Sequence, residues 1–324
     1  MNPHERGTPV NVLAFDIGGT NLRSALVDDG GRLGARRDRP TPVGNLPALL
    51  AAIVAEAHAL QADADRSPVA LGIAIAGYTD THRGLVYASP AVGLRDASLG
   101  APLRDALGLP VRLVNDVNAA AWGEARVAGS ADLVALFIGT GVGTGFVSSG
   151  TLVEGHHGMA AEGGHVIWRE GGLPCPLGHA GCYEMYLGGN ALGERARQAG
   201  LGADAHALVA AWRAGSGAAA AIMRDAQDAV GSLCRLLVTL MDPERIVIAG
   251  GVASRTPELL AAARAAVSPH PLSAAAGAVR VDPATLGDRA GLMGAAWLAH
   301  ALVAKGMLPR DSELPPKGHG IPPA

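Results

Sequence analysis

The sequence predicts an α/β protein with two related lobes. At 324 residues the chain is long enough for two domains, since a domain commonly holds ~150 residues. Apolar runs that end in glycine turns and lead into helical segments occur in both halves, so one strand–turn–helix plan is present twice. Hydrophobic residues make up 49% of the chain and charged residues 17%, a composition that excludes an intrinsically disordered protein.

The first half of the chain is expected to be rich in strands. Asp28–Gly31 is typical of a hairpin turn between two of them. The Ala- and Leu-rich segment Leu46–Leu60 has a period near four and predicts a helix, and a second helix is expected at 119–127. Strands are expected at 10–15, 22–27, from Arg32 onward, 69–75, 111–114 and 133–138, the last opening into a glycine turn over 139–145.

The second half is expected to be mainly helical. Residues 151–182 form a loop-rich stretch in which Gly, His and Cys gather. Helices are expected at 183–199, 205–214, 218–240, 257–266 and 290–303, and strands at 245–248 and 279–281. The tail from Met307 carries five prolines and no periodicity, so 306–324 is expected to be extended or disordered.

Charge and cysteine content exclude several classes of protein. The net charge of −3 argues against nucleic acid or an anionic membrane surface as the partner. Three cysteines are too few for a disulfide scaffold. The first residues contain no signal peptide and no run of ~18 apolar residues occurs, so we expect a cytoplasmic protein without membrane contact.

Three glycine-containing turns follow apolar strands: DIGGT at 16–20, GTGVGTG at 139–145 and AGG at 249–251. Such turns let backbone N–H groups approach phosphate oxygens, although each alone is also typical of an ordinary hairpin or βα turn. None matches the P-loop or the dinucleotide-binding pattern, which argues against both classes. The expected phosphate and Mg²⁺ residues are Asp16, Gly18, Gly19, Thr20, Thr140, Gly141, Gly250 and Gly251.

The order of six short segments resembles the ROK family of sugar kinases and sugar-responsive repressors. These segments are AFDIGGTNLRSALVD, VNDVNAAAWGE, LFIGTGVGTG, AEGGH, CPLGHAGCYE and VIAGGV, and the resemblance spans about residues 10–300. It implies the two-lobed actin-like ATPase (ribonuclease H-like) fold of the hexokinase–actin group, with ATP and sugar in the cleft between the lobes. The implied lobes are 1–117 plus about 290–305, and 118–289 with a zinc-type loop.

The resemblance assigns the general base to Asp116, the Asp of the Asn-Asp pair in VNDVN. Transfer of a phosphoryl group to a sugar needs a base that takes the hydroxyl proton. From the residues alone, Asp116 is equally suited to capping the helix that follows. The resemblance also implies sugar hydroxyl contacts from Asn115, Glu162, His165 and Glu184.

One departure from the family concerns the sugar pocket. ROK glucokinases carry an Asn in a segment resembling SPNLPGW, whereas this chain reads Ser89-Pro90-Ala91-Val92-Gly93-Leu94. Ala91 therefore stands where Asn is expected, and Leu94 replaces Trp. A pocket that lacks one polar partner discriminates less well at the corresponding hydroxyl.

A second departure concerns the zinc-type loop. The family pattern CxCGxxGCxE is here Cys-Pro-Leu-Gly-His-Ala-Gly-Cys-Tyr-Glu, so Leu177 stands in place of the second Cys. Some ROK fructokinases use a Cys-x-x-His-x-x-Cys arrangement, and His179 supplies a similar ligand one residue further along. The expected zinc ligands are His165, Cys175, His179 and Cys182. Cys234 falls in an apolar helix and is expected to be a buried hydrophobe.

The sequence therefore predicts an ATP-dependent hexose kinase with Mg²⁺ as cofactor, glucose as first substrate and a homodimer or higher homo-oligomer as the assembly. The main alternative is a kinase for fructose, mannose or an N-acetyl amino sugar, and polyphosphate remains an alternative donor. A ROK repressor is disfavoured, since only 15 residues precede Asp16, too few for a helix-turn-helix domain.

Overall fold

The computed structural model describes residues 10–268 and 277–304, which divide into two compact units. One unit holds the described residues up to Leu113 together with those from Ala296, and the other is Val114–Ala295. The sequence placed these boundaries near 117 and 290. Asn115 and Asp116 therefore belong to the second unit rather than to the end of the first. The Pro-rich tail predicted at 306–324 lies outside the described residues.

The first unit is built on a sheet with the strand order β3-β2-β1-β4-β8. Its strands are β1 (Asn11–Ile17), β2 (Asn21–Asp28), β3 (Leu33–Pro40), β4 (Leu71–Ile75) and β8 (Val111–Asn115). The first three form an antiparallel meander, and β4 runs parallel to β1. The turn DIGGT thus connects two antiparallel neighbours.

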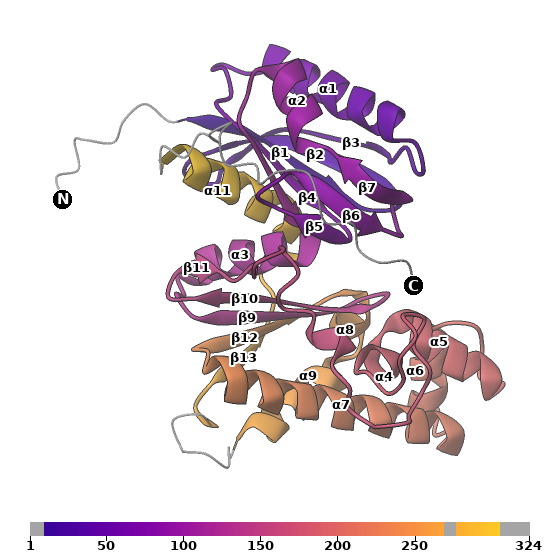
Figure 1. The fold of residues 1–324 in the computed structure, drawn as a ribbon. Coiled ribbons are helices and arrows are strands. Elements are labelled where there is room, and N and C mark those ends of the chain that lie inside the picture. The colour runs from indigo at the N-terminus through magenta and orange to yellow at the C-terminus, as the bar shows by residue number, and fades with distance from the viewer. Residues whose placement is uncertain (1–9, 269–276, 305–324) are drawn as a thin grey trace. The chain divides into compact units, whose positions relative to one another are not determined.

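Helices cover both faces of this sheet (Figure 1): α1 (Leu46–Ala62) and α2 (Gly100–Leu107) on one face, α11 (Ala290–Ala304) on the other. Asn45 begins α1 by accepting the Ala48 N–H at 3.0 Å. Leu49 and Ile53 of α1 pack with Phe15 of β1 in the buried core of the unit.

A small antiparallel sheet in the first unit was not predicted. It contains β5 (Tyr78–Asp80), β6 (Leu85–Ser89) and β7 (Leu94–Ser98) in the order β5-β6-β7. These strands are short, and Pro90 and Gly93 interrupt the region between β6 and β7, so no clear period of two marks them.

The second unit repeats the plan of the first sheet. Its strand order is β11-β10-β9-β12-β13, with a meander of three antiparallel strands and then parallel neighbours. The strands are β9 (Leu133–Ile138), β10 (Val142–Ser148), β11 (Thr151–Leu152), β12 (Arg245–Ala249) and β13 (Arg280–Pro283). The prediction of two related α/β lobes is confirmed by this repeat.

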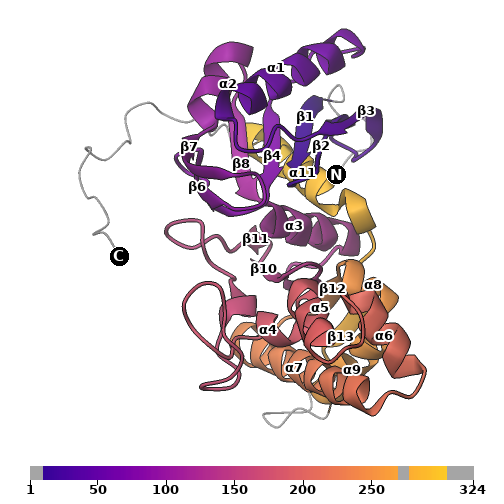
Figure 2. The ribbon, with the colours of Figure 1, turned by 90° about the vertical axis from the view of Figure 1, so that its right-hand side faces the viewer.

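The second sheet carries α3 (Asp116–Ala128) on one face and α7 (Gly217–Met241) with α9 (Pro257–Val267) on the other (Figure 1). Beside α7 lie three shorter helices (Figure 2): α4 (Glu184–Leu187), α5 (Gly189–Gln198) and α6 (Ala205–Arg213). The remaining short elements are α8 (Gly251–Arg255), η1 (Gly163–His165) and η2 (Gly287–Arg289). The single helix predicted at 183–199 is wrong, because Gly188 adopts an extended conformation and separates α4 from α5.

The glycine turn predicted over 139–145 is also too long. The turn covers 139–141, and Val142–Ser148 is strand β10, antiparallel to β9. A Cβ on Gly143 would lie 2.7 Å from Val117 Cγ2, and one on Gly145 would lie 2.6 Å from the Ala121 Cβ. The two glycines therefore serve the close packing of α3 on the strand, and their lack of side chains conceals the strand pattern.

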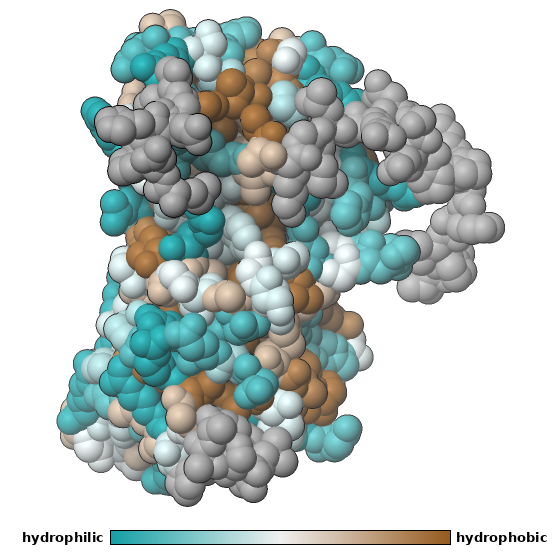
Figure 3. Space-filling view, turned by 90° about the vertical axis from the view of Figure 1, so that its left-hand side faces the viewer, coloured by the Kyte–Doolittle hydropathy of each residue, from teal (hydrophilic) through white to brown (hydrophobic). Residues whose placement is uncertain are grey.

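The surface exposes hydrophobic side chains, as expected from a chain with few charged residues. Exposed large hydrophobic side chains are spread over it, from Val43 to Leu240. On the face drawn in Figure 3, hydrophobic residues alternate with hydrophilic ones. Over the described residues, the helices lack the length and apolar character needed to cross a bilayer.

Candidate functional site

The junction between β8 and α3 places two of the predicted site residues. Asn115 is the N-cap of α3, since its Oδ1 accepts the Asn118 N–H at 3.0 Å. Asp116 is the first residue of the helix, and its Oδ1 accepts from the Val117 N–H at 3.0 Å and from Asn115 Nδ2 at 3.2 Å. Asn115 is therefore the N-cap of the helix, while Asp116 Oδ1 binds one first-turn N–H group and Asn115 Nδ2.

Strand β10 anchors the segment that carries Glu162 and His165. The Thr144 hydroxyl donates to the Ala161 carbonyl at 2.5 Å and accepts the Gly163 N–H at 3.0 Å. The His165 N–H donates to the Glu162 carbonyl at 3.0 Å, which closes the turn of η1. The Thr144 hydroxyl thus holds the backbone on either side of Glu162, and the turn of η1 places His165 after it.

The same strand binds Glu184, the first residue of α4. Glu184 Oε2 accepts the Val142 N–H at 2.8 Å, directly after the glycine turn at 139–141. The Tyr183 N–H donates to the Val166 carbonyl at 3.1 Å, which ties α4 to the segment that follows His165. Glu184 therefore lies between the turn and the loop of Glu162.

Two neighbouring carboxylates, those of Asp116 and Glu184, act on the carboxyl group of Glu162. Burial and the charges of Asp116 and Glu184 together raise the pKa of Glu162 to about 7, with burial as the largest cause. Burial also raises the pKa of Asp116, against the opposing effect of its hydrogen bond from Val117. Asp116 is only partly exposed, so water stabilises its charge less than at an open surface.

Strain accompanies this cluster at Ala161, whose φ of +70° lies in the left-handed region. That region costs a residue with a Cβ about 1–2 kcal/mol. The hydrogen bond from Thr144 to the Ala161 carbonyl holds the conformation in place. The strained residue directly precedes Glu162, in keeping with the concentration of backbone strain at functional sites.

Two of the predicted phosphate turns lie in the second unit. Thr140 is exposed, and its carbonyl accepts the Asn190 N–H at 3.0 Å, while the Gly189 N–H donates to the Gly139 carbonyl at 2.8 Å. Gly141 precedes β10 directly. The turn at 139–141 is thereby fastened to the start of α5.

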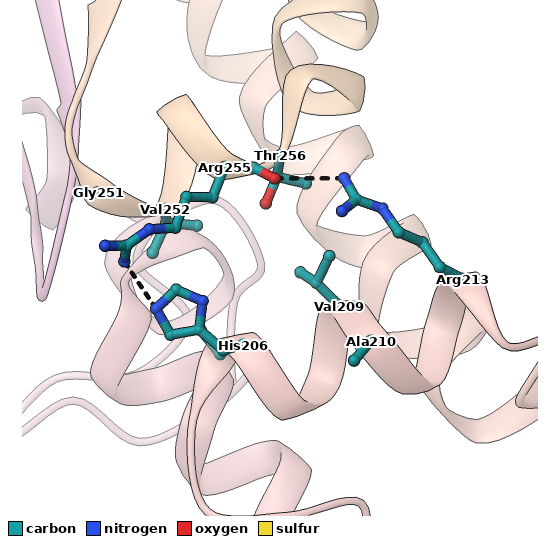
Figure 4. Close-up of a pocket in the computed structure, with 9 residues that line it drawn as sticks. His206, Val209, Ala210, Arg213, Gly251, Val252, Arg255 and Thr256 are labelled. Atoms are coloured by element: carbon teal, nitrogen blue, oxygen red, sulfur yellow. Dashed lines mark hydrogen bonds between the residues drawn. The ribbon is translucent and has the colours of Figure 1, made fainter.

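The other turn, Gly250 and Gly251, joins β12 to α8. Gly251 borders a cavity of about 310 Å³ between α6 and α8, shown in Figure 4. The residues around the cavity are Ala205, His206, Val209, Ala210, Arg213, Gly251, Val252, Arg255 and Thr256. The α6 side chains around this cavity were not predicted, because α6 carries no recognisable motif, whereas Gly251 and Val252 belong to the VIAGGV segment.

The third predicted turn, DIGGT, lies in the first unit between β1 and β2. The Gly18 N–H donates to the Asn21 carbonyl at 3.0 Å, and Thr20 is exposed. Asp16 Oδ2 lies 3.4 Å from Arg23 Nη1, so an arginine shares this carboxylate. A Cβ on Gly19 would lie 2.7 Å from the Ala91 carbonyl oxygen, which places Ala91 directly against the turn.

The four predicted zinc ligands come together in the second unit. The ligand atoms of His165, Cys175, His179 and Cys182 all lie within 4.8 Å of one another. His165 Nδ1 and His179 Nε2 are buried without a hydrogen-bond partner. Buried nitrogens of this kind are costly unless something binds them, and Cys₂His₂ is a common zinc ligand set. The residues present therefore fit a tetrahedral zinc ion.

Backbone pairing explains why His179 replaces the missing cysteine. The Cys175 N–H donates to the His179 carbonyl at 2.8 Å, and Pro174 pairs with Ala180 in an isolated bridge. This tight turn brings the His179 side chain back to Cys175, whereas Leu177 at its tip is 57% exposed. The extra residue in the spacing is absorbed by the turn.

Aromatic residues and an ion-pair network pack against the loop that carries the predicted zinc ligands. Trp168 stacks on Tyr183 with ring centroids 5.9 Å apart and meets Tyr186 edge to face at 4.8 Å. Arg169 lies over Trp168, with 4.0 Å from its Cζ to the ring centroid. Asp225 of α7 binds Arg169 at 2.8 Å and Arg195 at 2.6 Å. No local sequence pattern marks this network, because its members lie on α4, α5, α7 and the loop before α4.

Comparison with known proteins places the chain among sugar kinases. A sequence profile of the ROK family matches residues 12–302. A glucokinase of Streptomyces coelicolor is 31% identical over 309 residues, which covers 89% of this chain and 96% of the relative. An N-acetylmannosamine kinase of Citrobacter koseri is 35% identical over 249 residues, covering 75% of this chain and 84% of the relative.

A solved structure shows the same fold. It is described as a ROK family glucokinase from Streptomyces griseus in complex with glucose and AMPPNP. The TM-score is 0.73 at 31% identity, with 90% of this chain and 99% of that chain covered. The fold predicted from the sequence, that of the actin-like ATPases, is confirmed by this likeness together with the repeated sheet plan.

Proposed function

This chain belongs to the ROK family, and on that basis we propose that it transfers the γ-phosphoryl group of ATP to a hexose. Glucose is the first substrate that we assign, and its 6-hydroxyl is the acceptor. The glucokinase relative and the S. griseus complex with glucose and AMPPNP, an analogue of ATP, support both substrates. The cytoplasmic location and the homo-oligomeric assembly stay predictions of the sequence.

The observation that carries this proposal is the placement of Asp116. Its neighbour Asn115 is the N-cap of α3, and the hydrogen bonds that Asn115 and Val117 donate to the Asp116 carboxylate both end on Oδ1. Burial raises its pKa, which makes the carboxylate a stronger base than an exposed aspartate. In the reaction, Asp116 takes the proton of the 6-hydroxyl as that oxygen bonds to the γ-phosphorus and ADP leaves.

We assign sugar recognition to Asn115, Glu162, His165 and Glu184. Glu162 and Glu184 present carboxylate oxygens that accept from sugar hydroxyls, and β10 fixes the positions of both. Fixed acceptors of this kind select a sugar by the orientation of its hydroxyls, because an unmatched buried group stays unpaired. The Asn115 amide, held between Asn118 and Asp116, would orient the acceptor hydroxyl beside the base.

For the donor, we assign the turn at 139–141 to the phosphates, with the exposed Thr140 hydroxyl as a donor. The turn at Gly18–Thr20 is assigned the same role, and Asp16 the Mg²⁺ ion that accompanies ATP. Gly250 and Gly251 were predicted to bind phosphate as well. Because Gly251 borders the cavity between α6 and α8, we now assign this turn to the nucleoside part of ATP.

Zinc would be held by His165, Cys175, His179 and Cys182. When bound, it supplies a structural cross-link between the segment of Glu162 and the start of α4. Two of the side chains assigned to sugar recognition, Glu162 and Glu184, flank this cross-link in the sequence. Its role in the proposal is to keep these carboxylates in position.

The replacement Asp116→Asn tests the assignment of the base. It keeps the hydrogen bond from Val117 but removes the proton acceptor, so kcat should fall by about 10²–10⁴-fold while the KM for glucose changes little. Asp105→Asn, at a position that is 76% exposed on α2, is the matched control and should leave kcat unchanged. Near-normal kcat in Asp116→Asn would overturn the assignment.

An N-acetyl amino sugar is the second candidate substrate, favoured by the N-acetylmannosamine kinase relative and by Ala91. A panel of glucose, mannose, fructose and N-acetylmannosamine with ATP separates the two candidates. Glucose should react, and Ala91→Asn should tighten glucose by about 2- to 13-fold, the worth of one neutral hydrogen bond. Activity on N-acetylmannosamine or fructose alone would exclude glucokinase and leave a sugar kinase of this family.

A further inference from the structure

The DIGGT turn is held by a residue that lies outside the two strands it connects. Thr41, directly after β3, donates its backbone N–H to the Thr20 carbonyl at 3.0 Å. The Thr41 hydroxyl donates to the Gly18 carbonyl at 2.7 Å. One residue of the first unit therefore binds the carbonyl groups at both ends of the turn.

The sequence around Thr41 makes this contact rigid. Thr41 stands between Pro40 and Pro42. A residue that precedes proline is restricted to extended backbone, and neither proline has an N–H group. Thr41 is therefore the member of this tripeptide that supplies a backbone donor, and its neighbours limit the conformations from which it can do so.

The hydroxyl of Thr41 decides which way one peptide group of the turn points. In a planar trans peptide, the C=O group and the N–H group that follows it point in opposite directions. Because the Gly18 carbonyl is turned toward Thr41, the Gly19 N–H points away from it. Backbone N–H groups in such turns bind anions, whereas a carbonyl oxygen in the same place would repel a phosphate oxygen.

A second backbone segment packs against the same turn. The position that a Cβ on Gly19 would take lies 2.7 Å from the Ala91 carbonyl oxygen. Residues 41–44 continue to this segment, since the Gly44 N–H donates to the Val92 carbonyl at 2.9 Å. The turn is therefore bounded by two segments that are bonded to each other, which leaves its peptide groups little room to rotate.

We propose that Thr41 is a positioning residue for the phosphates of the donor nucleotide. Its hydroxyl holds the Gly18 peptide in the orientation that directs the Gly19 N–H at a phosphate oxygen. This inference rests on the proposed kinase function, in which the turn binds phosphate. Thr41 acts through the turn, so a change at this position should affect the phosphates of the nucleotide and leave the sugar unaffected.

Thr41→Val tests the role of the hydroxyl, because it keeps the shape of the side chain and the bond from the backbone N–H. The Gly18 carbonyl then loses its partner and can turn toward water, which carries the Gly19 N–H away from the phosphate. Affinity for MgATP, measured by calorimetry, and kcat/KM for ATP should both fall by about 10- to 100-fold, the worth of one hydrogen bond to a charged group. The KM for the sugar and the affinity for adenosine, which has no phosphate, should stay unchanged.

Two further variants serve as controls, and circular dichroism checks that each variant is folded. Thr41→Ser keeps the hydroxyl and should restore the affinity for MgATP. Thr239→Val on α7 removes a bond of the same kind in the second unit, where the hydroxyl donates to the Arg235 carbonyl at 2.9 Å, and should alter neither affinity.

Unchanged affinity for MgATP in Thr41→Val, or equal losses of affinity for ATP and adenosine, would overturn the proposal. A loss that Thr41→Ser does not restore would overturn it as well, since such a loss does not depend on the hydroxyl. If the unaltered enzyme binds MgATP but transfers its phosphoryl group to no sugar of the panel, the proposed kinase function is wrong instead.

Discussion

The prediction with the largest structural consequence concerns zinc. The purified protein should contain about one zinc per chain, bound by His165, Cys175, His179 and Cys182. Replacing His179 with Ala should lower that content well below one. Replacing the exposed His82, which lies in the first unit, should leave it unchanged. Both variants are compared by elemental analysis after identical purification.

The expected loss of unfolding free energy on zinc removal follows from two buried histidine nitrogens that have no hydrogen-bond partner. Without metal, His165 Nδ1 and His179 Nε2 are buried and unpaired. An unsatisfied buried polar group costs about 1–3 kcal/mol, so the pair costs about 2–6 kcal/mol before the loop relaxes. Removing zinc with a chelator should therefore lower the free energy of unfolding by that order, measured by denaturant titration with and without metal.

Kinetic measurements on the zinc-depleted protein provide a further test of the zinc prediction. Because the four ligands lie between Glu162 and Glu184 in the chain, zinc removal should also raise the KM for the sugar. A metal-free protein with unchanged unfolding free energy and unchanged kinetics would show that the four residues serve no metal. Equal zinc content in His179→Ala and His82→Ala would show that any metal binds elsewhere.

Three further predictions concern the surroundings of this loop. Ala161→Gly relieves about 1–2 kcal/mol of left-handed strain and adds about 0.5–1 kcal/mol of chain entropy cost, so stability should rise by about 0–1.5 kcal/mol in thermal unfolding. The free energy of unfolding should fall as pH rises from about 4.5 to about 7 because of Glu162. Burial and neighbouring charges raise its folded-state pKa to about 7, so the folded protein keeps this proton at pH values where the unfolded chain has lost it. Glu162→Gln should flatten that dependence in unfolding titrations. Asp225→Asn should lower the free energy of unfolding by about 1–3 kcal/mol, because Arg169 and Arg195 lose a charged partner.

Two of these three changes have a control in the chain. Glu170→Gln, at an exposed position, should leave the pH dependence as it is, and Asp228→Asn, exposed on α7, should leave stability unchanged. The two arginines lower the pKa of Asp225 against the opposing effect of burial, so its contribution should be present at neutral pH and lost as pH falls below about 4. Destabilisation by Ala161→Gly, or equal effects of Asp225→Asn and Asp228→Asn, would contradict the corresponding argument.

The repeated sheet could be predicted from sequence because its signals are local. Apolar runs such as Leu133–Ile138 predict strands, and glycine turns such as the one predicted over 139–145 mark where a strand ends. Strand β10 gave no such signal. Gly143 and Gly145 carry no side chain because α3 packs on them, and a requirement of tertiary packing leaves no periodicity in the strand itself.

The candidate site also contains residues that could be predicted from the sequence and residues that could not. Resemblance to the family singled out Asp116 and the four zinc ligands, and the structure brings those ligands together. Local pattern did not decide which of Asn115 and Asp116 caps α3, since both residue types suit that position. Arg255 and His206 were not predicted, because their meeting depends on the packing of α6 near α8, and no local sequence pattern encodes that approach.

The arrangement around β10 connects these separate parts into one functional unit. Its glycines hold α3, and with it Asp116, while Val142 binds Glu184 and Thr144 fixes the backbone on either side of Glu162. The strand begins directly after the turn at 139–141. A single strand thus positions the proposed base, two acidic groups and the proposed phosphate turn relative to one another. Because close packing leaves little room for adjustment, a displacement of β10 would disturb all four together. The glycines of the GTGVGTG segment therefore contribute to function through packing on α3 as well as through the turn that they form.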